Sequence, residues 1–374
     1  MKKKIKVFTI LGTRPEVIKL APVIQELKKH QKTIISKVVL TGQHRSMVDQ
    51  FLDLFGIKPD FDLDIMLKNQ TLFDVSSRCI SRLSVILQKE MPDIILVQGD
   101  TTTAFIAALC GFYLKIPTGH VEAGLRTYDK FRPYPEEVNR QLISVVADMH
   151  FVPTKVSRDN LLKEKISSRS IYLTGNTVVD ALYSIAKRKH EFTDPVLKKI
   201  DFKNKKVILV TAHRRESFGG PFQSICRALE SIADIENTEI IYPVHLNPNV
   251  QKPVHELLKS KKNIHLLKPL DYLSLVHILK DCYFVLSDSG GIQEEAPTFG
   301  KPILVMREVT ERPEGVSSGI AKLVGMDHER IIKETKKLLN SKAAYDKMAR
   351  VVNPYGDGKA AKRIVSAIQG RFSV

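Results

Sequence analysis

Short apolar runs alternate with longer amphipathic segments along the whole chain, and this alternation constrains the fold more than any other feature of the sequence. In the first half the runs lie at residues 5–11, 36–42, 93–99, 117–123, 149–153 and 171–175. The segments between them, such as residues 15–29 and 135–147, carry apolar side chains at helical spacing. Strands that alternate with helices in this way are typical of βαβ units around a parallel sheet.

The same pattern restarts after a polar, lysine-rich stretch at residues 188–205. Its apolar runs lie at residues 206–213, 239–245, 263–268, 283–288 and 301–306. A length of 374 residues suits two domains, because an ordinary domain has roughly 100 to 200 residues. We therefore expect an α/β fold of two doubly wound, Rossmann-like domains, residues 1–187 and 206–354, joined by a linker at residues 188–205.

The chain is predicted to have neither a membrane span nor a disulfide framework. No run approaches the roughly 18 to 20 apolar residues of a membrane-spanning helix, and the first residues lack the cleavage site of a signal peptide. The four cysteines are scattered without a CxxC pair, which argues against disulfides and against a zinc site. These features favour the cytoplasm.

The formal net charge of +17 raises the question of nucleic-acid binding. The excess is spread evenly: residues 1–187 carry 27 Lys and Arg against 19 Asp and Glu, and residues 188–374 carry 31 against 22. The sequence has no basic tail, no tryptophan and no interleaved aromatic residues that could stack on bases. We therefore expect no nucleic-acid partner and a surface that attracts small polyanions.

Asp100 follows an apolar run and precedes three threonines, in the sequence QGDTTTA. Ligands of open parallel sheets collect at the carboxyl ends of the strands, where loops and helix N-termini converge. Two interpretations are open: a carboxylate that faces a ligand, or the N-cap of the next helix, which is a common position for aspartate. From this stretch alone the cap is favoured.

Two further strand ends of the first half carry charged side chains. Arg14 follows the first run beside an expected helix N-terminus, which suits an anion such as phosphate. His120 and Glu122 stand two apart on one face of an expected strand, where they could form a structural hydrogen-bonded pair. Without an HExxH companion a metal pair is not expected. Glu136 and Glu137 follow, and several carboxylates at strand ends suit proton transfer better than capping.

The second half predicts a different chemistry, the binding of a nucleotide. Glycines at a helix start let a ligand approach the backbone, whose N–H groups bind phosphate oxygens. Glu294 and Glu295 lie on the first turns beyond, where they could accept hydrogen bonds from sugar hydroxyls. The candidate phosphate ligands are His213, Arg214 and Arg215 after one strand and Ser289, Gly290 and Gly291 after another.

Nine motifs spread over nearly the whole chain resemble, in the same order, those of the non-hydrolysing UDP-N-acetylglucosamine 2-epimerases. They are GTRPEVIKLAPVI, QGDTTTA, GHVEAGLRT, PEEVNR, TGNTVVDAL, TAHRRESFG, YPVHLNPNV, LSDSGGIQEEAPTFGKPILVMRE and NPYGDGKAAKRI. The resemblance implies the glycosyltransferase-B type of architecture, with two Rossmann-like domains that face each other across the active-site cleft. It also implies a C-terminal helix at residues 355–374 that crosses back to the first domain. Members of this family are cytoplasmic homodimers that need no cofactor or metal and supply N-acetylmannosamine units for surface polysaccharides.

The resemblance further implies a mechanism and its residues. Inversion at C2 of the sugar proceeds by elimination of UDP to 2-acetamidoglucal and re-addition of UDP, which requires two opposed proton-transfer groups. The catalytic residues would be Asp100, Glu122, Glu136 and His213. UDP-N-acetylglucosamine and UDP would be bound by Arg14, Lys19, His213, Ser289, Gly290, Gly291, Glu295 and Arg312.

Bacterial members of the family bind a second molecule of UDP-N-acetylglucosamine beside the active site as an allosteric activator. The matching residues in this chain are Gln43, His44, Glu136, Arg214 and His245. Ser46 and Asn69 stand where some relatives have Gln and Arg, so a diphosphate contact is expected to be missing. We therefore expect activation that requires more effector.

Other functions remain open. A glycosyltransferase of the same architecture would use the same nucleotide site, but it needs an acceptor pocket, and the carboxylates argue against it. Hydrolysing 2-epimerases release free N-acetylmannosamine and UDP. Some non-hydrolysing relatives act on UDP-diacetamido uronic acids, although DTTTA at residues 100–104 is more similar to the N-acetylglucosamine type. A non-catalytic nucleotide-sugar sensor is disfavoured by the three carboxylates.

Overall fold

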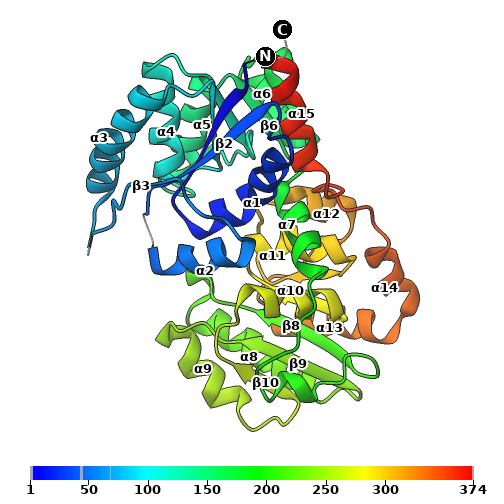
Figure 1. Ribbon diagram of the computed structural model, residues 1–374. Helices are drawn as coiled ribbons and strands as arrows, with labels where there is room; N and C mark the ends of the chain where they lie inside the picture. The colour runs from blue at the N-terminus through cyan, green and yellow to red at the C-terminus, as the bar shows by residue number, and fades with distance from the viewer. Residues whose placement is uncertain (1–2, 43–44, 68, 373–374) are drawn as a thin grey trace. The chain divides into compact units, whose positions relative to one another are not determined.

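The computed structural model describes residues 3–42, 45–67 and 69–372, and the chain divides into two compact units. The first unit comprises Met1–Ala181 and Gly356–Val374, and the second comprises Leu182–Tyr355. Each unit has one parallel β-sheet with helices packed against it (Figure 1). The fold is therefore α/β with two Rossmann-like units, and the predicted fold class is confirmed.

The first unit is built on a seven-stranded sheet in the order β3-β2-β1-β4-β5-β6-β7. Its strands are β1 (Ile5–Leu11), β2 (Ile34–Leu40), β3 (Phe61–Asp62), β4 (Ile94–Gln98), β5 (Thr118–Val121), β6 (Met149–Val152) and β7 (Ile171–Leu173). Its helices are α1 (Arg14–Lys29), α2 (Arg45–Phe55), α3 (Leu72–Glu90), α4 (Thr102–Tyr113), α5 (Glu136–Val146), α6 (Lys155–Lys163), the 3-10 turn η1 (Ser168–Ser170), α7 (Thr177–Ala186), which runs on into the second unit, and α15 (Ala360–Phe372). The strand order reverses between β1 and β4, so the carboxyl ends of these strands form the switch point where ligands of such sheets bind.

The second unit repeats the plan with six parallel strands in the order β10-β9-β8-β11-β12-β13. Its strands are β8 (Lys206–Thr211), β9 (Thr238–Pro243), β10 (Ile264–Leu267), β11 (Phe284–Ser287), β12 (Ile303–Val305) and β13 (Ala321–Leu323). Its helices and 3-10 turns are η2 (Leu197–Lys199), η3 (Arg215–Ser217), α8 (Gly220–Ala233), α9 (Pro248–Leu258), α10 (Tyr272–Asp281), α11 (Gly290–Glu295), η4 (Ala296–Phe299), α12 (Pro313–Ser318), α13 (His328–Asn340) and α14 (Lys342–Ala349). Its switch point lies between the ends of β8 and β11.

The central strands are continuously apolar because helices cover both faces of each sheet. All five residues of β4 are buried, and so are four of the six residues of β8. On α3 the side chains of Val75, Cys79, Leu83 and Leu87 recur every four residues and are buried in the core of the first unit. The apolar periodicity of the sequence therefore identifies the helix faces and the strands that are buried in the core.

The C-terminal helix α15 packs on the first unit beside α1 (Figure 1). Asp180 accepts hydrogen bonds from the backbone N–H groups of Ala360 and Ala361 at 3.2 and 3.0 Å. Arg363 Nη1 donates to Thr174 O at 2.9 Å. The end of the chain thus completes the first unit, although the last strand of that unit ends at Leu173.

All eleven predicted strands are present, and two others were not predicted. β3 (Phe61–Asp62) and β13 (Ala321–Leu323) are short and each includes a charged residue, so neither forms an apolar run. The division between the units falls between Ala181 and Leu182, inside α7, whereas the sequence predicts a linker at residues 188–205. Those residues belong to the second unit, where Leu197 is buried in the core, because their few apolar side chains suffice to anchor them.

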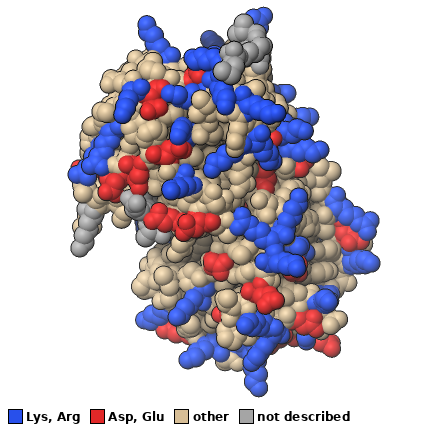
Figure 2. Space-filling model, viewed as in Figure 1, with Lys and Arg blue, Asp and Glu red and all other residues tan. Residues whose placement is uncertain are grey.

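Charged side chains of both signs are interspersed on the face drawn in Figure 2, with Lys and Arg spread over both units. This distribution agrees with the even division of charge along the sequence. The four cysteines are buried thiols. In the described part of the chain, no helix combines the length and the apolar character needed to cross a membrane.

Candidate functional site

In the first unit a buried glutamate ties together the loops that follow β1 and β4. Glu16, in the first turn of α1, accepts hydrogen bonds from the backbone N–H groups of Gly12 and Thr13 at 2.9 and 2.7 Å. Its other oxygen accepts from the Thr101 hydroxyl at 2.7 Å. Burial raises the pKa of Glu16, and these hydrogen bonds offset the rise only in part. Glu16 therefore shapes the switch point from inside the protein.

Asp100 is not the cap of the helix that follows it. The N-cap of α4 is Thr101, whose hydroxyl accepts from Ala104 N at 3.0 Å. The carboxylate of Asp100 pairs instead with Arg140 of α5, with 2.7 Å between Oδ2 and Nη2, and a quarter of its side chain is exposed. The capping interpretation is therefore wrong, because α4 begins one residue later than a cap at Asp100 would require.

Glu122 is held by three donors at the end of β5. Lys19 Nζ and Asn176 Nδ2 contact its Oε1, the latter at 3.0 Å, and Gln98 Nε2 contacts its Oε2. The residue is 8% exposed and has a left-handed φ of 64°. Such a backbone conformation costs on the order of 1 kcal/mol or more for a residue other than glycine and is concentrated at functional sites. One cation and two amides thus fix the orientation of an almost buried carboxylate.

His120 and Glu122 do not share a strand face, contrary to the sequence-based prediction. β5 ends at Val121, and the left-handed turn at Glu122 takes its side chain out of the strand alternation. The His120 ring contacts Gly99 O through Nε2 at 2.7 Å. Complete burial and nearby cations lower the pKa of His120 to about 3, so the ring is neutral and donates to this carbonyl. His120 therefore ties β5 to the loop after β4.

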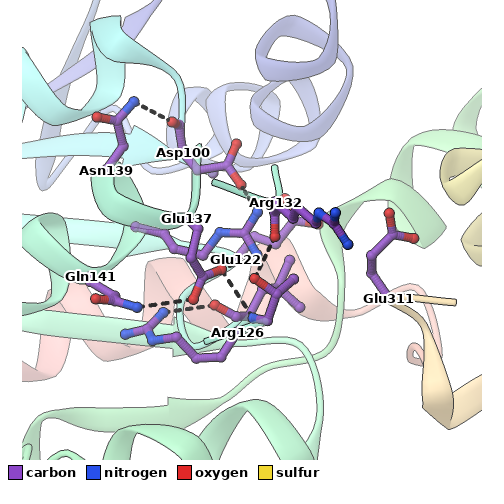
Figure 3. A network of polar contacts seen from close by, with 12 residues as sticks. Asp100, Glu122, Arg126, Arg132, Glu137, Asn139, Gln141 and Glu311 are labelled. Atoms are coloured by element: carbon purple, nitrogen blue, oxygen red, sulfur yellow. Dashed lines mark hydrogen bonds and ion pairs between the residues drawn. The ribbon is translucent and has the colours of Figure 1, made fainter. Parts of the chain in front are cut away.

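Helix α5 carries Glu136 and two residues that hold Asp100, of which Asn139 is labelled in Figure 3. Glu136 is the first residue of the helix and is partly exposed. Asn139 Nδ2 donates to Asp100 O at 2.9 Å, and Arg140, the next residue, holds the Asp100 carboxylate. One rigid helix therefore places Glu136 directly and Asp100 through two contacts.

In the second unit the carboxylate at the strand end itself makes the tie. Asp288 follows β11 and is fully buried. Its Oδ2 accepts from the backbone N–H groups of His213 and Arg214, each at 2.7 Å. Because His213 and Arg214 follow β8, Asp288 links the two strand ends at the switch point of the second sheet. Asp288 was not selected from the sequence, although it stands after an apolar run as Asp100 does.

The side chains of His213 and Arg214 lie beside this tie. The His213 ring stacks on His245, with 5.3 Å between centroids and 11° between planes. A Cβ added to Gly290 would lie 3.4 Å from Arg214 Nη2, so the guanidinium lies over the backbone at the start of α11. An arginine thus lies against a glycine backbone, and the neighbouring residue in the chain carries an imidazole, a combination suited to an anion.

The predicted phosphate segment begins α11, which has only six residues. Ser289 is its N-cap residue, and Ser289 N donates to Ser287 Oγ at 2.9 Å. Gly290 is buried and Gly291 is exposed. The backbone at Gly291 is therefore accessible, while that at Gly290 is covered by neighbouring side chains.

The two glutamates of α11 differ in a way that the sequence did not predict. Glu294 is 2% exposed and accepts a hydrogen bond from Arg312 Nε, so it holds this arginine and does not face a sugar. Glu295 is partly exposed, and its Oε1 accepts from the Tyr272 hydroxyl at 3.4 Å. Adjacent residues of a helix point about 100° apart, so Glu295 can be partly exposed although Glu294 is buried.

The remaining predicted residues are described in part. Gln43 and His44 of the expected effector site lie outside the described residues. Asn69 has a left-handed φ of 58°, and His245 Nδ1 accepts from Asn247 N at 3.1 Å. Arg14 is exposed, with its guanidinium carbon 5.8 Å from the centroid of the Phe51 ring.

Three residues that contact the expected carboxylates were missed by the sequence analysis. Gln98 and Asn176 are each 3% exposed and stand at or after strand ends. A polar residue in such a position must find a partner inside the protein, and this signal could have identified both. Arg140 has no comparable signal, because an arginine on an amphipathic helix is ordinarily exposed.

The two switch points support different chemistry. The first presents carboxylates held by cations and amides, which suits proton transfer. The second presents backbone N–H groups, an arginine and a histidine, which suits an anion such as a diphosphate. Within the ranges that the structure describes, no three His, Cys, Asp or Glu side chains come together as metal ligands would.

Comparisons with known proteins agree over nearly the whole chain. The family model described as UDP-N-acetylglucosamine 2-epimerase matches residues 25–369. The UDP-N-acetylglucosamine 2-epimerase of Yersinia pestis is 50% identical over 370 residues, which cover 97% of this chain and 98% of that protein. The Bacillus subtilis (strain 168) protein of the same name is 48% identical over 367 residues, or 98% of this chain and 95% of the relative.

A solved structure leads to the same family. The crystal structure of UDP-GlcNAc 2-epimerase from Neisseria meningitidis bound to UDP-GlcNAc is similar with a TM-score of 0.87 at 48% identity. The similarity covers 98% of this chain and 100% of that one. The chain therefore belongs to the UDP-N-acetylglucosamine 2-epimerase family of isomerases.

Proposed function

We propose that the protein interconverts UDP-N-acetylglucosamine and UDP-N-acetylmannosamine without hydrolysing either. Membership of the family and the bound ligand of the Neisseria meningitidis relative support this substrate. The single observation that carries the proposal is the environment of Glu122, an almost buried carboxylate held by a lysine and two amides at a strand end. A carboxylate whose orientation is fixed in this way suits the transfer of a proton.

The reaction consists of an elimination and its reversal on the other face. A carboxylate removes the proton from C2, the electron pair forms a C1–C2 double bond, and the C1–O bond breaks with its electrons on the β-phosphate oxygen of UDP. The products are 2-acetamidoglucal and UDP. In the return step the UDP oxygen attacks C1, and C2 takes a proton on the opposite face.

Proton transfer is assigned to the first unit. Asp100, Glu122 and Glu136 are the acid and base groups, and Lys19 faces the reacting sugar and the diphosphate. Asp100 and Glu122 follow neighbouring strands, and the loops that carry them lie close together. A Cβ added to Gly99, which precedes Asp100, would lie 3.7 Å from Glu122 Oε2. Close attachment of this kind suits a mechanism that needs two proton-transfer groups around one carbon atom.

Binding of UDP is assigned mainly to the second unit. His213, Ser289, Gly290 and Gly291 would contact the diphosphate. Glu295 would accept hydrogen bonds from the ribose hydroxyls, and Arg312 completes the UDP site. These cations and N–H dipoles neutralise the charge that develops on the departing UDP.

Incubation with UDP-N-acetylglucosamine in deuterated water, followed by NMR, tests the proposal. We expect both UDP-sugars with deuterium at C2 and no added cofactor, because the C2 proton exchanges with solvent through the carboxylates. Retention of the original C2 hydrogen in the product would contradict the mechanism and point to oxidation and reduction at C3. Free N-acetylmannosamine in the same chromatogram would place the protein in the hydrolysing branch. If the protein turned over only a UDP-diacetamido uronic acid, that compound would replace UDP-N-acetylglucosamine as the proposed substrate.

The proposed cellular context is surface polysaccharide synthesis in the cytoplasm.

The proposed partner is a second copy of the chain. The helices α3, α4 and α5 lie side by side on the first unit (Figure 1). Their exposed apolar side chains support an association, and light scattering measures it. These side chains are Phe73, Val85, Phe112 and Val145.

A further inference from the structure

Glu137 is a buried carboxylate that the proposed mechanism does not use. It lies beside Glu136 on α5 and is fully buried. The backbone N–H groups of Thr127 and Tyr128 donate to its Oε2 and Oε1, each at 3.0 Å, and Gln141 Nε2 donates to Oε1 at 3.0 Å (Figure 3). Arg140 Nη1 lies 3.3 Å from Oε2. The carboxylate is engaged on both oxygens and cannot meet a substrate.

Arg140 connects this carboxylate with Asp100. Its side chain is 9% exposed, its Nη1 faces Glu137, and its Nη2 lies 2.7 Å from Asp100 Oδ2. A planar guanidinium has donors in a rigid fork and can hold two carboxylates at once, whereas an ammonium is a single point charge. Arg140 therefore orients Asp100. Because its one positive charge is shared by two carboxylates, the three side chains of Arg140, Asp100 and Glu137 together carry a net negative formal charge.

Glu137 also holds the middle of the segment between β5 and α5. Thr127 and Tyr128 lie midway along this segment, and the Thr127 hydroxyl donates to Arg132 O at 2.5 Å. A purely structural role for Glu137 would be to fix this segment. The contact through Arg140 to Asp100 indicates a second role, and the two can be separated by experiment.

We propose that Glu137 and Arg140 are positioning residues for Asp100. The inference rests on the proposed function, in which Asp100 transfers a proton at C2. Helix α5 would then set the geometry of two reacting carboxylates, Glu136 as its own first residue and Asp100 through Arg140. A misplacement of about 1 Å at a reacting group can reduce the rate about 100-fold, so a loosened Asp100 would slow the chemistry. UDP affinity depends on other residues and would stay unchanged.

The test uses Arg140→Lys and Glu137→Gln in the full-length protein. Arg140→Lys keeps the charge and loses the fork, and Glu137→Gln keeps the shape and loses the charge. We expect each to lower kcat about 10- to 100-fold with KM within about threefold, since the effect is on the reacting geometry. In an Asp100→Asn background, either substitution should cost less than about a further threefold, because its target is already disabled.

Arg126→Lys is the matched control. Arg126 is another arginine with a buried side chain in the same unit, and it holds Glu164 with contacts of 2.6 and 2.7 Å. Its other hydrogen bonds go to Leu125 O and Ser144 Oγ. We expect Arg126→Lys to lower the Tm comparably but to leave kcat within about twofold.

Two outcomes would overturn the inference: unchanged kcat in folded variants, or losses that multiply fully with that of Asp100→Asn. If Glu137→Gln fails to fold, Arg140→Lys decides the question alone. The wild-type protein separates this inference from the proposed function. A wild-type protein that incorporates no deuterium at C2 contradicts the function, whereas active wild-type protein with fully active variants contradicts only the positioning role.

Discussion

The switch points of the two sheets share one device and apply it with different residues. In each unit a fully buried carboxylate accepts two backbone N–H groups from the loop after the first central strand. In the first unit the carboxylate is Glu16, which comes from the helix α1. In the second unit it is Asp288, which stands at the end of β11.

This difference decides what each switch point can do. Because Glu16 makes the tie in the first unit, the strand-end carboxylate Asp100 is left to pair with Arg140 and keeps a quarter of its side chain exposed. In the second unit the strand-end carboxylate, Asp288, is buried and itself accepts the two backbone hydrogen bonds, so it does not face a ligand. The groups that remain there to face a ligand are backbone N–H groups and the side chains of His213 and Arg214. The first switch point therefore suits proton transfer, and the second suits an anion.

The largest expected effect is the loss of kcat when a proton-transfer group of the first unit is substituted, compared with the loss of UDP affinity when a binding residue of the second unit is substituted. Glu122→Gln should lower kcat about 100- to 10,000-fold, because a positioned acid or base is lost, with UDP affinity nearly intact. Glu295→Ala should instead weaken UDP binding about 10- to 100-fold, the equivalent of one charge-assisted hydrogen bond of about 1.5 to 3 kcal/mol. Initial rates and calorimetry with UDP on both variants make the comparison.

The reverse result would break the comparison between the units. If Glu122→Gln abolished UDP binding and Glu295→Ala left it unchanged, the chemical roles of the two switch points would have to be exchanged. Circular dichroism of both variants checks that neither result comes from unfolding.

A second prediction concerns the pH dependence of stability. The pKa of His120 is about 3 in the folded protein against an ordinary value of 6.5, so the unfolded chain binds the proton first as the pH falls. The stability due to neutral His120 is fully present above pH 6.5 and is lost progressively toward pH 3. Between pH 6.5 and 5.0 this residue alone should lower the free energy of unfolding by about 2 kcal/mol.

His120→Gln is the variant that checks this effect. Glutamine keeps a donor for Gly99 O but cannot titrate, so the variant should lose about 2 kcal/mol less than the wild type over the same interval. Urea unfolding at pH 6.5 and 5.0 measures both proteins. The buried His150, whose pKa is also lowered chiefly by burial, contributes equally to each and cancels. Equal losses in the two proteins would assign the acid sensitivity to other groups.

The smallest expected effect concerns the second substrate molecule. Rates against UDP-N-acetylglucosamine should be sigmoidal, and pure UDP-N-acetylmannosamine should turn over slowly until a trace of its epimer is added. Asn69→Arg should lower the half-saturating effector concentration about tenfold, the lower end of the range for one charge-assisted hydrogen bond to the diphosphate, because position 69 is exposed and solvent screens the contact. Steady-state rates with purified epimers measure this concentration.

Asn69→Gln is the control, since it brings a longer side chain to the same left-handed backbone without the charge. An equal shift in both variants would rule out a charge effect. Hyperbolic rates that are prompt from pure UDP-N-acetylmannosamine would show that the second site does not operate.

The parts of the site that could be predicted from sequence are those that stand next to a strand. The sequence predicts Asp100 and Glu122 because each closely follows an apolar run, and the structure places both at neighbouring strand ends. Their roles in catalysis stay predictions. The direction of the Glu122 side chain was missed, because a left-handed turn after a strand leaves no periodic trace in the sequence.

The sequence by itself determined the two sets of alternating strands and helices and the family, since apolar periodicity and motifs are local and can be read within about ten residues. Only the tertiary structure decided which charged groups hold one another. The Thr101 hydroxyl meets Glu16 across 85 positions, and His213 N meets Asp288 across 75. Such partners are chosen by the strand order of the sheet and by the need to satisfy every buried polar group, and neither is visible in one segment of the chain.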